Sequence, residues 1–245
     1  LLRAARRARP LPVALPATSH PPLTERIVAM SSPRVRTTHV VPAFVAGLFL
    51  IGLAGSASGG SGLSDADFAR AIAAASDGAL SVPDDPVVRE ALDEILASKK
   101  AQRFFAGGLD RSADWQTLVA PALADGGLPA QLAAVPLVES GYRNFGVDVG
   151  GESLAPGQGG TGLWMFIPET ARTYGLQVDP TVDERLDPAR ETEAAVALLT
   201  DLHHEFGDWG LALAAYNQGP KQVRTAIDEV GSRDVTALCA AGALN

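Results

Sequence analysis

The chain has 245 residues and a formal net charge of −8 at pH 7, and residues 58–245 alone hold 13 Lys and Arg against 27 Asp and Glu. So acidic a surface is a poor match for nucleic acid, whose binding depends on neutralising phosphates. The single cysteine, Cys239, allows no internal disulfide and no cysteine-rich metal site. Residues 58–245 are enough for one hydrophobic core, so we expect a single domain there.

The amino-terminal part of the chain has the pattern of an export signal. Residues 1–29 precede the first methionine and lack apolar periodicity, so we expect them to be an upstream extension without structure. Residues 30–57 combine Arg34 and Arg36 with an apolar run and small residues at its end, which is typical of a cleaved secretory signal peptide. The run is shorter than the ~20 residues that span a bilayer. An uncleaved amino-terminal anchor is the alternative.

The rest of the chain has apolar residues at helical spacing. Residues 58–86 are interpreted as a flexible linker containing one short helix, and residues 87–245 as the folded domain. Neither sustained alternation nor internal repeats occur, so we predict an all-α fold. The predicted helices cover residues 63–75, 87–105, 112–124, 129–140, 168–174, 188–206, 209–217 and 220–230.

Local signals predict where these helices begin and end. Gly107-Gly108 is expected to stop the helix before it. Asp187 and Asp208 are expected to be N-caps, and Gly231 is expected to follow the last helix. The helix over 209–217 is apolar on all sides, so it should be central and buried.

Glu139 is the first candidate functional residue. It lies near the end of a helix predicted to begin with Pro129 as its first residue. Leu128, Leu132 and Val135 share its helix face, so the carboxyl group should face the core or a cleft wall. Burial raises the pKa of a carboxylic acid, and a Glu protonated near neutral pH can donate a proton to a leaving group. The simpler alternative is a solvated or salt-bridged Glu at a helix end.

Two more segments stand out against the Ala-rich helices: residues 162–166, Gly-Leu-Trp-Met-Phe, and residues 215–219, Ala-Tyr-Asn-Gln-Gly. Taken singly, Trp164 could be a core residue and Asn217 a helix cap. With Glu139-Ser140, in this order and spacing, the segments resemble the lysozyme-like domain of lytic transglycosylases. The resemblance is to the membrane-bound lytic murein transglycosylase D type and covers about residues 87–230.

The resemblance implies an enzyme that acts on peptidoglycan glycan strands. Glu139 would protonate the bond between N-acetylmuramic acid and N-acetylglucosamine, and would then act as base to form a 1,6-anhydro ring. It implies no cofactor or metal, and a periplasmic or cell-envelope location after export, with no tight membrane insertion once the signal is cleaved. The substrate-binding residues it implies are Ser153, Trp164, Met165, Tyr216 and Asn217.

The chain departs from this family in two places. Met165 stands where the family usually has Gln, so a side chain with amide donors and an acceptor is replaced by a thioether that is only a weak acceptor. The connection after Ser140 is longer than usual and contains Asp148 and Glu152. A second carboxylate opposite Glu139 would permit hydrolysis, as in a lysozyme. A non-catalytic peptidoglycan-binding module is the other alternative, and the sequence leaves the oligomeric state open.

Overall fold

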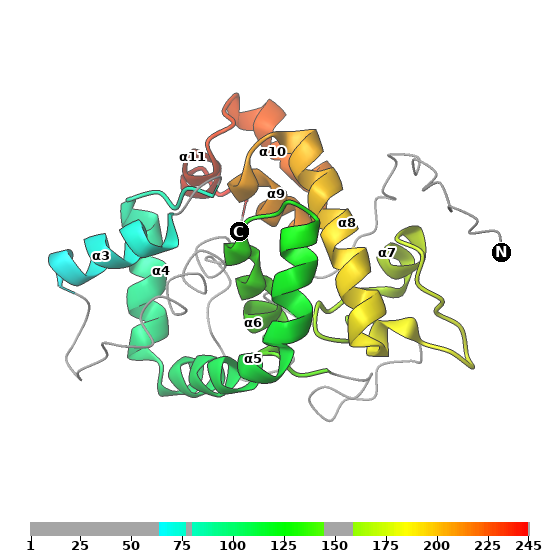
Figure 1. The fold of residues 1–245 in the computed structure, drawn as a ribbon. Helices are drawn as coiled ribbons and strands as arrows, with labels where there is room; N and C mark the ends of the chain where they lie inside the picture. The colour runs from blue at the N-terminus through cyan, green and yellow to red at the C-terminus, as the bar shows by residue number, and fades with distance from the viewer. Residues whose placement is uncertain (1–63, 77–79, 145–158, 245) are drawn as a thin grey trace.

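Helices supply nearly all the regular structure of the protein. The computed structural model describes residues 64–76, 80–144 and 159–244, and within these ranges β-pairing is limited to two isolated bridges, Thr161 with Phe166 and Val178 with Asp183. The prediction of an all-α fold is confirmed. The elements are α3 (Asp65–Ala75), α4 (Pro86–Ala97), α5 (Lys99–Asp125), the 3-10 helix η1 (Ala130–Ala133), α6 (Ala134–Ser140), α7 (Pro168–Thr173), the 3-10 helix η2 (Glu184–Leu186), α8 (Pro188–Phe206), α9 (Trp209–Gln218), α10 (Pro220–Val230) and α11 (Val235–Ala240) (Figure 1).

The amino-terminal predictions are only partly accessible to the structure. The predicted extension (1–29) and signal peptide (30–57) lie outside the described residues. The short helix predicted after them is present as α3. Phe68 on this helix, with Leu80 and Val82 after it, belongs to the same hydrophobic cluster as the later helices. In the part of the chain that the structure describes, no helix is both long and apolar enough to cross a bilayer.

The prediction that Gly107-Gly108 ends a helix is wrong. The chain breaks earlier, at Ser98, whose extended backbone ends α4 and whose hydroxyl caps α5 by accepting from the Ala101 N–H. Helix α5 then runs through the glycine pair, and its ribbon turns sharply between its two ends (Figure 1). A Cβ at Gly108 would lie 2.5 Å from Leu137 Cδ1 and 3.3 Å from the Gly141 Cα. The glycine is therefore explained by the close approach of α6.

The helix that carries Glu139 starts later than predicted. Pro129 has an extended ψ of 134° and precedes the 3-10 helix, so it is not the first helical residue. The α-helical part begins at Ala134, which places Pro136 in the first turn. Proline is tolerated there because a first-turn N–H has no partner within its own helix. All seven residues of α6 are buried, so the whole segment is a core element.

The carboxy-terminal helices follow their predicted caps. The Asp187 side chain accepts from two backbone N–H groups at the start of α8, and Asp208 Oδ1 accepts from the Leu211 N–H, 2.9 Å away, at the start of α9. Helix α9 packs against α8 and α10, and its residues 211–215 are all buried, as predicted. Gly231 follows α10, but the chain continues into α11, which was not predicted.

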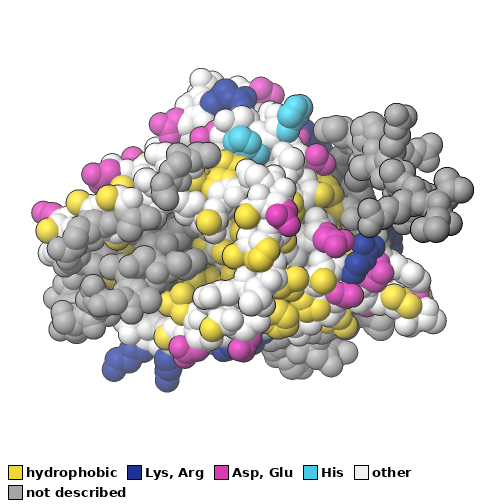
Figure 2. All heavy atoms as spheres, viewed as in Figure 1, with side chains coloured by type: hydrophobic (Ala, Val, Ile, Leu, Met, Phe, Trp, Pro, Cys, Tyr) yellow, Lys and Arg dark blue, Asp and Glu magenta, His cyan; other side chains and the backbone are white. Residues whose placement is uncertain are grey.

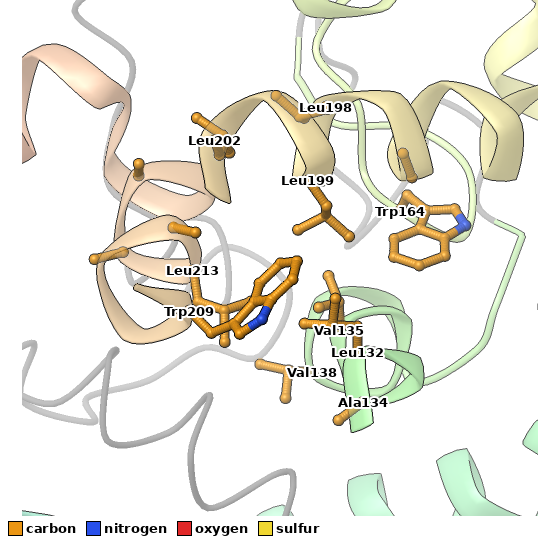
Figure 3. Close-up of a cluster of buried hydrophobic side chains, with 14 of the residues drawn as sticks. Leu132, Ala134, Val135, Val138, Trp164, Leu198, Leu199, Leu202, Trp209 and Leu213 are labelled. Carbon is orange, nitrogen blue, oxygen red and sulfur yellow. The ribbon is translucent and has the colours of Figure 1, made fainter. Parts of the chain in front are cut away.

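The core between these elements surrounds the helix that carries Glu139. Figure 3 shows Val135 and Val138 of α6 in one cluster with Leu199 of α8 and Trp209 of α9. Helix α6 is also in contact with α5. A short helix held from several directions by packed side chains has little freedom to shift.

Candidate active site

Glu139 lies at the penultimate position of α6 and is 2% exposed. The residues predicted to share its face, Leu128, Leu132 and Val135, are also buried. The predicted burial of the carboxyl group is confirmed, and the alternative of a solvated side chain is contradicted by the exposed fraction. Burial disfavours the charged form of a carboxyl group, which is the physical requirement for an acid that keeps its proton.

The backbone directly after Glu139 is held in an unusual conformation. Gly141 and Tyr142 both have positive φ angles, of 59° and 56°. Helix α5 fixes this turn: Arg111 Nε donates to the Gly141 carbonyl at 2.7 Å, and Trp115 Nε1 donates to the Tyr142 carbonyl at 3.2 Å. A non-glycine residue in the left-handed region persists only where its surroundings hold it there. The backbone that follows Glu139 is thus held by α5, so the position of Glu139 is fixed by this turn as well as by its own helix.

Ser140 connects α6 to the loop over residues 161–166. Its hydroxyl oxygen lies 2.8 Å from the Leu163 carbonyl oxygen and 3.0 Å from that of Pro136, so its one proton is shared between two acceptors. Ser140 is completely buried. The residue next to Glu139 is therefore joined to a segment more than twenty positions further along the chain.

Tyr216 connects α9 to the same loop. Its hydroxyl donates to the Trp164 carbonyl oxygen at 2.6 Å, which brings together the three segments singled out in the sequence. Asn217 follows it in α9, and both of its amide atoms are buried without a hydrogen-bond partner in the described structure. Burying a side-chain amide without partners is unfavourable by about 1–3 kcal/mol. A water molecule or a ligand that bonded to the Asn217 amide would remove this cost.

Trp164 and Met165 are both inside the protein. The Trp164 indole is completely buried, lies in the core close-up of Figure 3, and donates from Nε1 to the Thr192 hydroxyl at 3.0 Å. Met165 is 6% exposed and has a positive φ of 55°. Their predicted contacts with substrate stay predictions, and the burial of Trp164 favours a structural contribution from its side chain.

Ser153, Asp148 and Glu152 lie outside the described residues. Their predicted parts in substrate binding, or in supplying a second carboxylate for hydrolysis, stay predictions. Within the ranges that the structure describes, no three His, Cys, Asp or Glu side chains are grouped so as to hold a metal ion.

Sequence reasoning missed a buried charged cluster behind the loop. Glu191 is completely buried, and its two carboxylate oxygens accept from the N–H groups of Leu163, at 2.7 Å, and Trp164, at 3.0 Å. Burial raises the pKa of Glu191 well above its usual range, while the N–H groups and the nearby Arg185 oppose that rise. In the sequence, Glu191 is recognisable only as an acidic residue in the first turn of a predicted helix. Such a residue is ordinarily explained by its favourable interaction with the helix dipole.

Arg185 completes the cluster and is also completely buried. Its guanidinium group forms an ion pair with Asp183 at 2.6 Å and donates to the Phe166 carbonyl at 3.0 Å and the Gly159 carbonyl at 3.1 Å. These bonds compensate the loss of hydration that a buried guanidinium incurs. Arg185 thereby binds the last residue of the loop, Phe166, and the chain two residues before the loop begins, at Gly159.

Gly162 is required by this packing. Its φ is +87°, and a Cβ built on it would lie 2.2 Å from the Arg185 carbonyl oxygen and 2.3 Å from each carboxylate oxygen of Glu191. Only glycine lets the backbone approach the carboxylate so closely.

Comparison with known families agrees with this arrangement. Residues 118–238 match the family model of the Transglycosylase SLT domain. This part of the chain is a lysozyme-like transglycosylase SLT domain. The matched range begins within α5 and ends within α11, so the SLT domain contains Glu139, the loop over 161–166, the buried cluster and Tyr216.

Two kinds of curated relative are similar to the chain. One is "Membrane-bound lytic murein transglycosylase D" of Escherichia coli K12, which is 29% identical over 149 residues, or 60% of this chain and 30% of that protein. The other is "Putative tributyltin chloride resistance protein" of Alteromonas sp. strain M-1, which is 34% identical over 107 residues, or 43% of this chain and 48% of that protein. The chain thus spans less than half the length of either relative.

Proposed function

We propose that the SLT domain catalyses lytic cleavage of peptidoglycan, with Glu139 as its general acid and base. The observation that carries the proposal is the placement of Glu139: a carboxyl group 2% exposed, on a fully buried helix that is joined through Ser140 to the loop which Tyr216 also contacts. The family match over residues 118–238 and the printed name of the E. coli relative support the choice of substrate.

The chemistry needs only one carboxyl group. Glu139 donates its proton to the oxygen that links N-acetylmuramic acid to N-acetylglucosamine, and the bond from muramic C1 to that oxygen breaks. The carboxylate then accepts the proton of the muramic C6 hydroxyl as this oxygen attacks C1. Proton and bonds balance without water, and the products are a 1,6-anhydro end and a free 4-hydroxyl. Acid–base assistance of this kind contributes roughly 10²–10⁴-fold in rate.

Tyr216 and Asn217 are proposed to form the wall beside Glu139. Asn217 as a residue is half-buried, and the N–H donors and the oxygen acceptor of its buried side-chain amide have no partner in the described structure. These match the C=O and N–H groups of an N-acetyl substituent, which both sugars carry. We propose that Trp164 and Met165 contribute to substrate binding by forming the loop over 161–166. Ser153 is proposed to contact the substrate.

The function would be exerted outside the cytoplasm if the signal peptide over 30–57 is used. We propose export to the periplasm or cell envelope, followed by a linker over 58–86 and the domain over 87–245, with no tight membrane insertion after signal cleavage. The matched SLT range falls within that domain. Figure 2 shows Asp and Glu side chains spread over one face of the molecule, with fewer Lys and Arg, in keeping with a partner other than nucleic acid.

The test is digestion of purified sacculi with wild type, Glu139→Gln and Glu229→Gln, followed by mass spectrometry of the soluble products. Glu229 is an exposed carboxylate on α10, so its variant controls for the loss of a negative charge. We expect anhydro-muropeptides from wild type and Glu229→Gln and none from Glu139→Gln. Equal release by Glu139→Gln contradicts the assigned role. Products heavier by one water indicate hydrolysis, and sacculus binding without soluble product indicates a binding module.

A further inference from the structure

We propose that Glu191 is a positioning residue for the reaction, acting on the groups beside Glu139 through the loop over 161–166. This inference rests on the proposed function. Glu191 and Arg185 are both completely buried, so neither side chain is open to a substrate. Any effect on catalysis must therefore be transmitted through the groups that its carboxylate contacts.

One peptide unit transmits the contact from Glu191 to Ser140. Glu191 Oε1 accepts from the Trp164 N–H at 3.0 Å, and the carbonyl of the same peptide unit, that of Leu163, lies 2.8 Å from the Ser140 hydroxyl. A trans peptide is planar and its N–H and C=O point in opposite directions. The carboxylate on one side thus fixes where the acceptor for Ser140 lies on the other.

The effect on Tyr216 is one step less direct, because its acceptor is the carbonyl of Trp164, the residue whose N–H Glu191 holds. The Trp164 carbonyl oxygen accepts from the Tyr216 hydroxyl at 2.6 Å. The Leu163 N–H donates to Glu191 Oε2 at 2.7 Å. The carboxylate therefore binds the peptide unit before Leu163 through the Leu163 N–H and the one after it through the Trp164 N–H. Hydrogen bonds arranged in a chain polarise one another, so the bond from the Trp164 N–H to Glu191 strengthens the Leu163 carbonyl of the same peptide unit as an acceptor for Ser140.

The carboxyl group of Glu191 is specifically required by this geometry, because both of its oxygens keep acceptor capacity whether or not it carries a proton. Each of its oxygens faces a backbone N–H, and both contacts need an acceptor. A glutamine offers one acceptor oxygen, and its NH₂ group would face the other N–H. The loop must then shift, and with it the acceptors of Ser140 and Tyr216. A displacement of about 1 Å in groups that orient a reaction can lower the rate roughly 10²-fold.

The experiment compares four forms of the full chain: wild type, Glu191→Gln, Glu191→Asp and Glu193→Gln. Glu193 lies two residues further along α8 and its side chain is 68% exposed, so its variant removes a carboxylate from the same helix without touching the loop. Each form is tested for thermal unfolding, for kcat and KM on soluble glycan strands well below the unfolding midpoint, and for the pH dependence of the Leu163 and Trp164 amide NMR signals.

We expect Glu191→Gln to fold, with kcat lowered roughly 10–100-fold and KM little changed. Glu191→Asp should recover part of kcat, because it keeps two acceptor oxygens, and Glu193→Gln should match wild type. The two amide signals should titrate together in wild type and not in Glu191→Gln. A smaller folded fraction would also lower the apparent kcat at an unchanged KM, so the thermal unfolding curve must show that Glu191→Gln is fully folded at the assay temperature.

Three results overturn the inference: a folded Glu191→Gln with wild-type kcat, a loss expressed only in KM, or failure of both Glu191 variants to fold, which would assign the residue to stability alone. Failure of the proposed function is distinguished from these, because wild type itself would then release no product from the glycan strands.

Discussion

Substitution of Gly162 by alanine tests the packing on which the loop over 161–166 depends. Gly162 has a φ of +87°, and its new Cβ would lie 2.2–2.3 Å from oxygens of Arg185 and Glu191. Those oxygens belong to a backbone carbonyl and to a carboxylate held by two N–H groups, so neither can move aside freely. The left-handed conformation is unfavourable for alanine by about 1–2 kcal/mol. Overpacking in a buried site adds about 1–3 kcal/mol.

Gly175→Ala is the matched control. Gly175 has a φ of +83°, but nothing lies within 4 Å of the Cβ position, so only the conformational contribution of about 1–2 kcal/mol applies. The free energy of unfolding is measured by urea denaturation followed by circular dichroism. We expect Gly162→Ala to be less stable than Gly175→Ala by about 1–3 kcal/mol. Equal stability of the two variants would refute the tight packing of Gly162 on Glu191.

Three other properties follow from the described contacts. Tyr216→Phe should lower the free energy of unfolding by about 1–2 kcal/mol in urea denaturation, because the Trp164 carbonyl loses its donor, and an unchanged value would contradict that bond. Burial of the Cys239 thiol, and to a lesser extent the charges of Asp234 and Asp85, raise its pKa to about 11. Because the thiolate is the reactive form, alkylation of Cys239 at pH 8 should be roughly 100-fold slower in the folded protein than in denaturant. Equal alkylation rates would contradict the burial. Because the pKa of Glu191 is raised, the folded chain keeps a proton that the unfolded chain releases. The free energy of unfolding of wild type relative to Glu191→Gln should therefore fall as the pH rises above the usual Glu pKa. An increase of this difference with pH would contradict the raised pKa.

Features decided by neighbouring residues were predictable from the sequence. Asp187 and Asp208 cap their helices through contacts within three positions of each aspartate, and the continuous apolar surface of α9 required burial. The same reasoning could have found α11, since Asp234 caps it by accepting from the Thr236 and Ala237 N–H groups. The helix has only six residues, too few for a clear apolar period.

Features decided by distant residues were not predictable. Gly107-Gly108 has the local pattern of a helix end, and only the approach of Leu137 shows why Gly108 is there. Glu191 and Glu193 look alike in the sequence, yet one is completely buried against the loop and the other is 68% exposed. Which of these two carboxylates is buried depends on how α8 packs against the loop.

The candidate site falls between these two cases. Helical spacing with Leu132 and Val135 predicted that Glu139 is buried, which is correct, but Leu132 lies in the 3-10 helix and all seven residues of α6 are buried rather than one face. The resemblance grouped Ser140 with the loop over 161–166, but the hydrogen bond between them was not predicted. The conformation of Tyr142 also required the structure, because its positive φ depends on the hydrogen bond from Trp115 of α5.

The most direct test of the account is digestion of sacculi by wild type in water labelled with heavy oxygen, with Glu139→Gln in parallel. Attack by the muramic C6 hydroxyl takes no oxygen from solvent, so the account predicts unlabelled products one water lighter than reducing-end fragments, formed by wild type only. Labelled reducing ends, or unlabelled anhydro products from Glu139→Gln as well, would contradict the claim that the buried Glu139 carboxyl group first donates and then accepts the proton of the reaction.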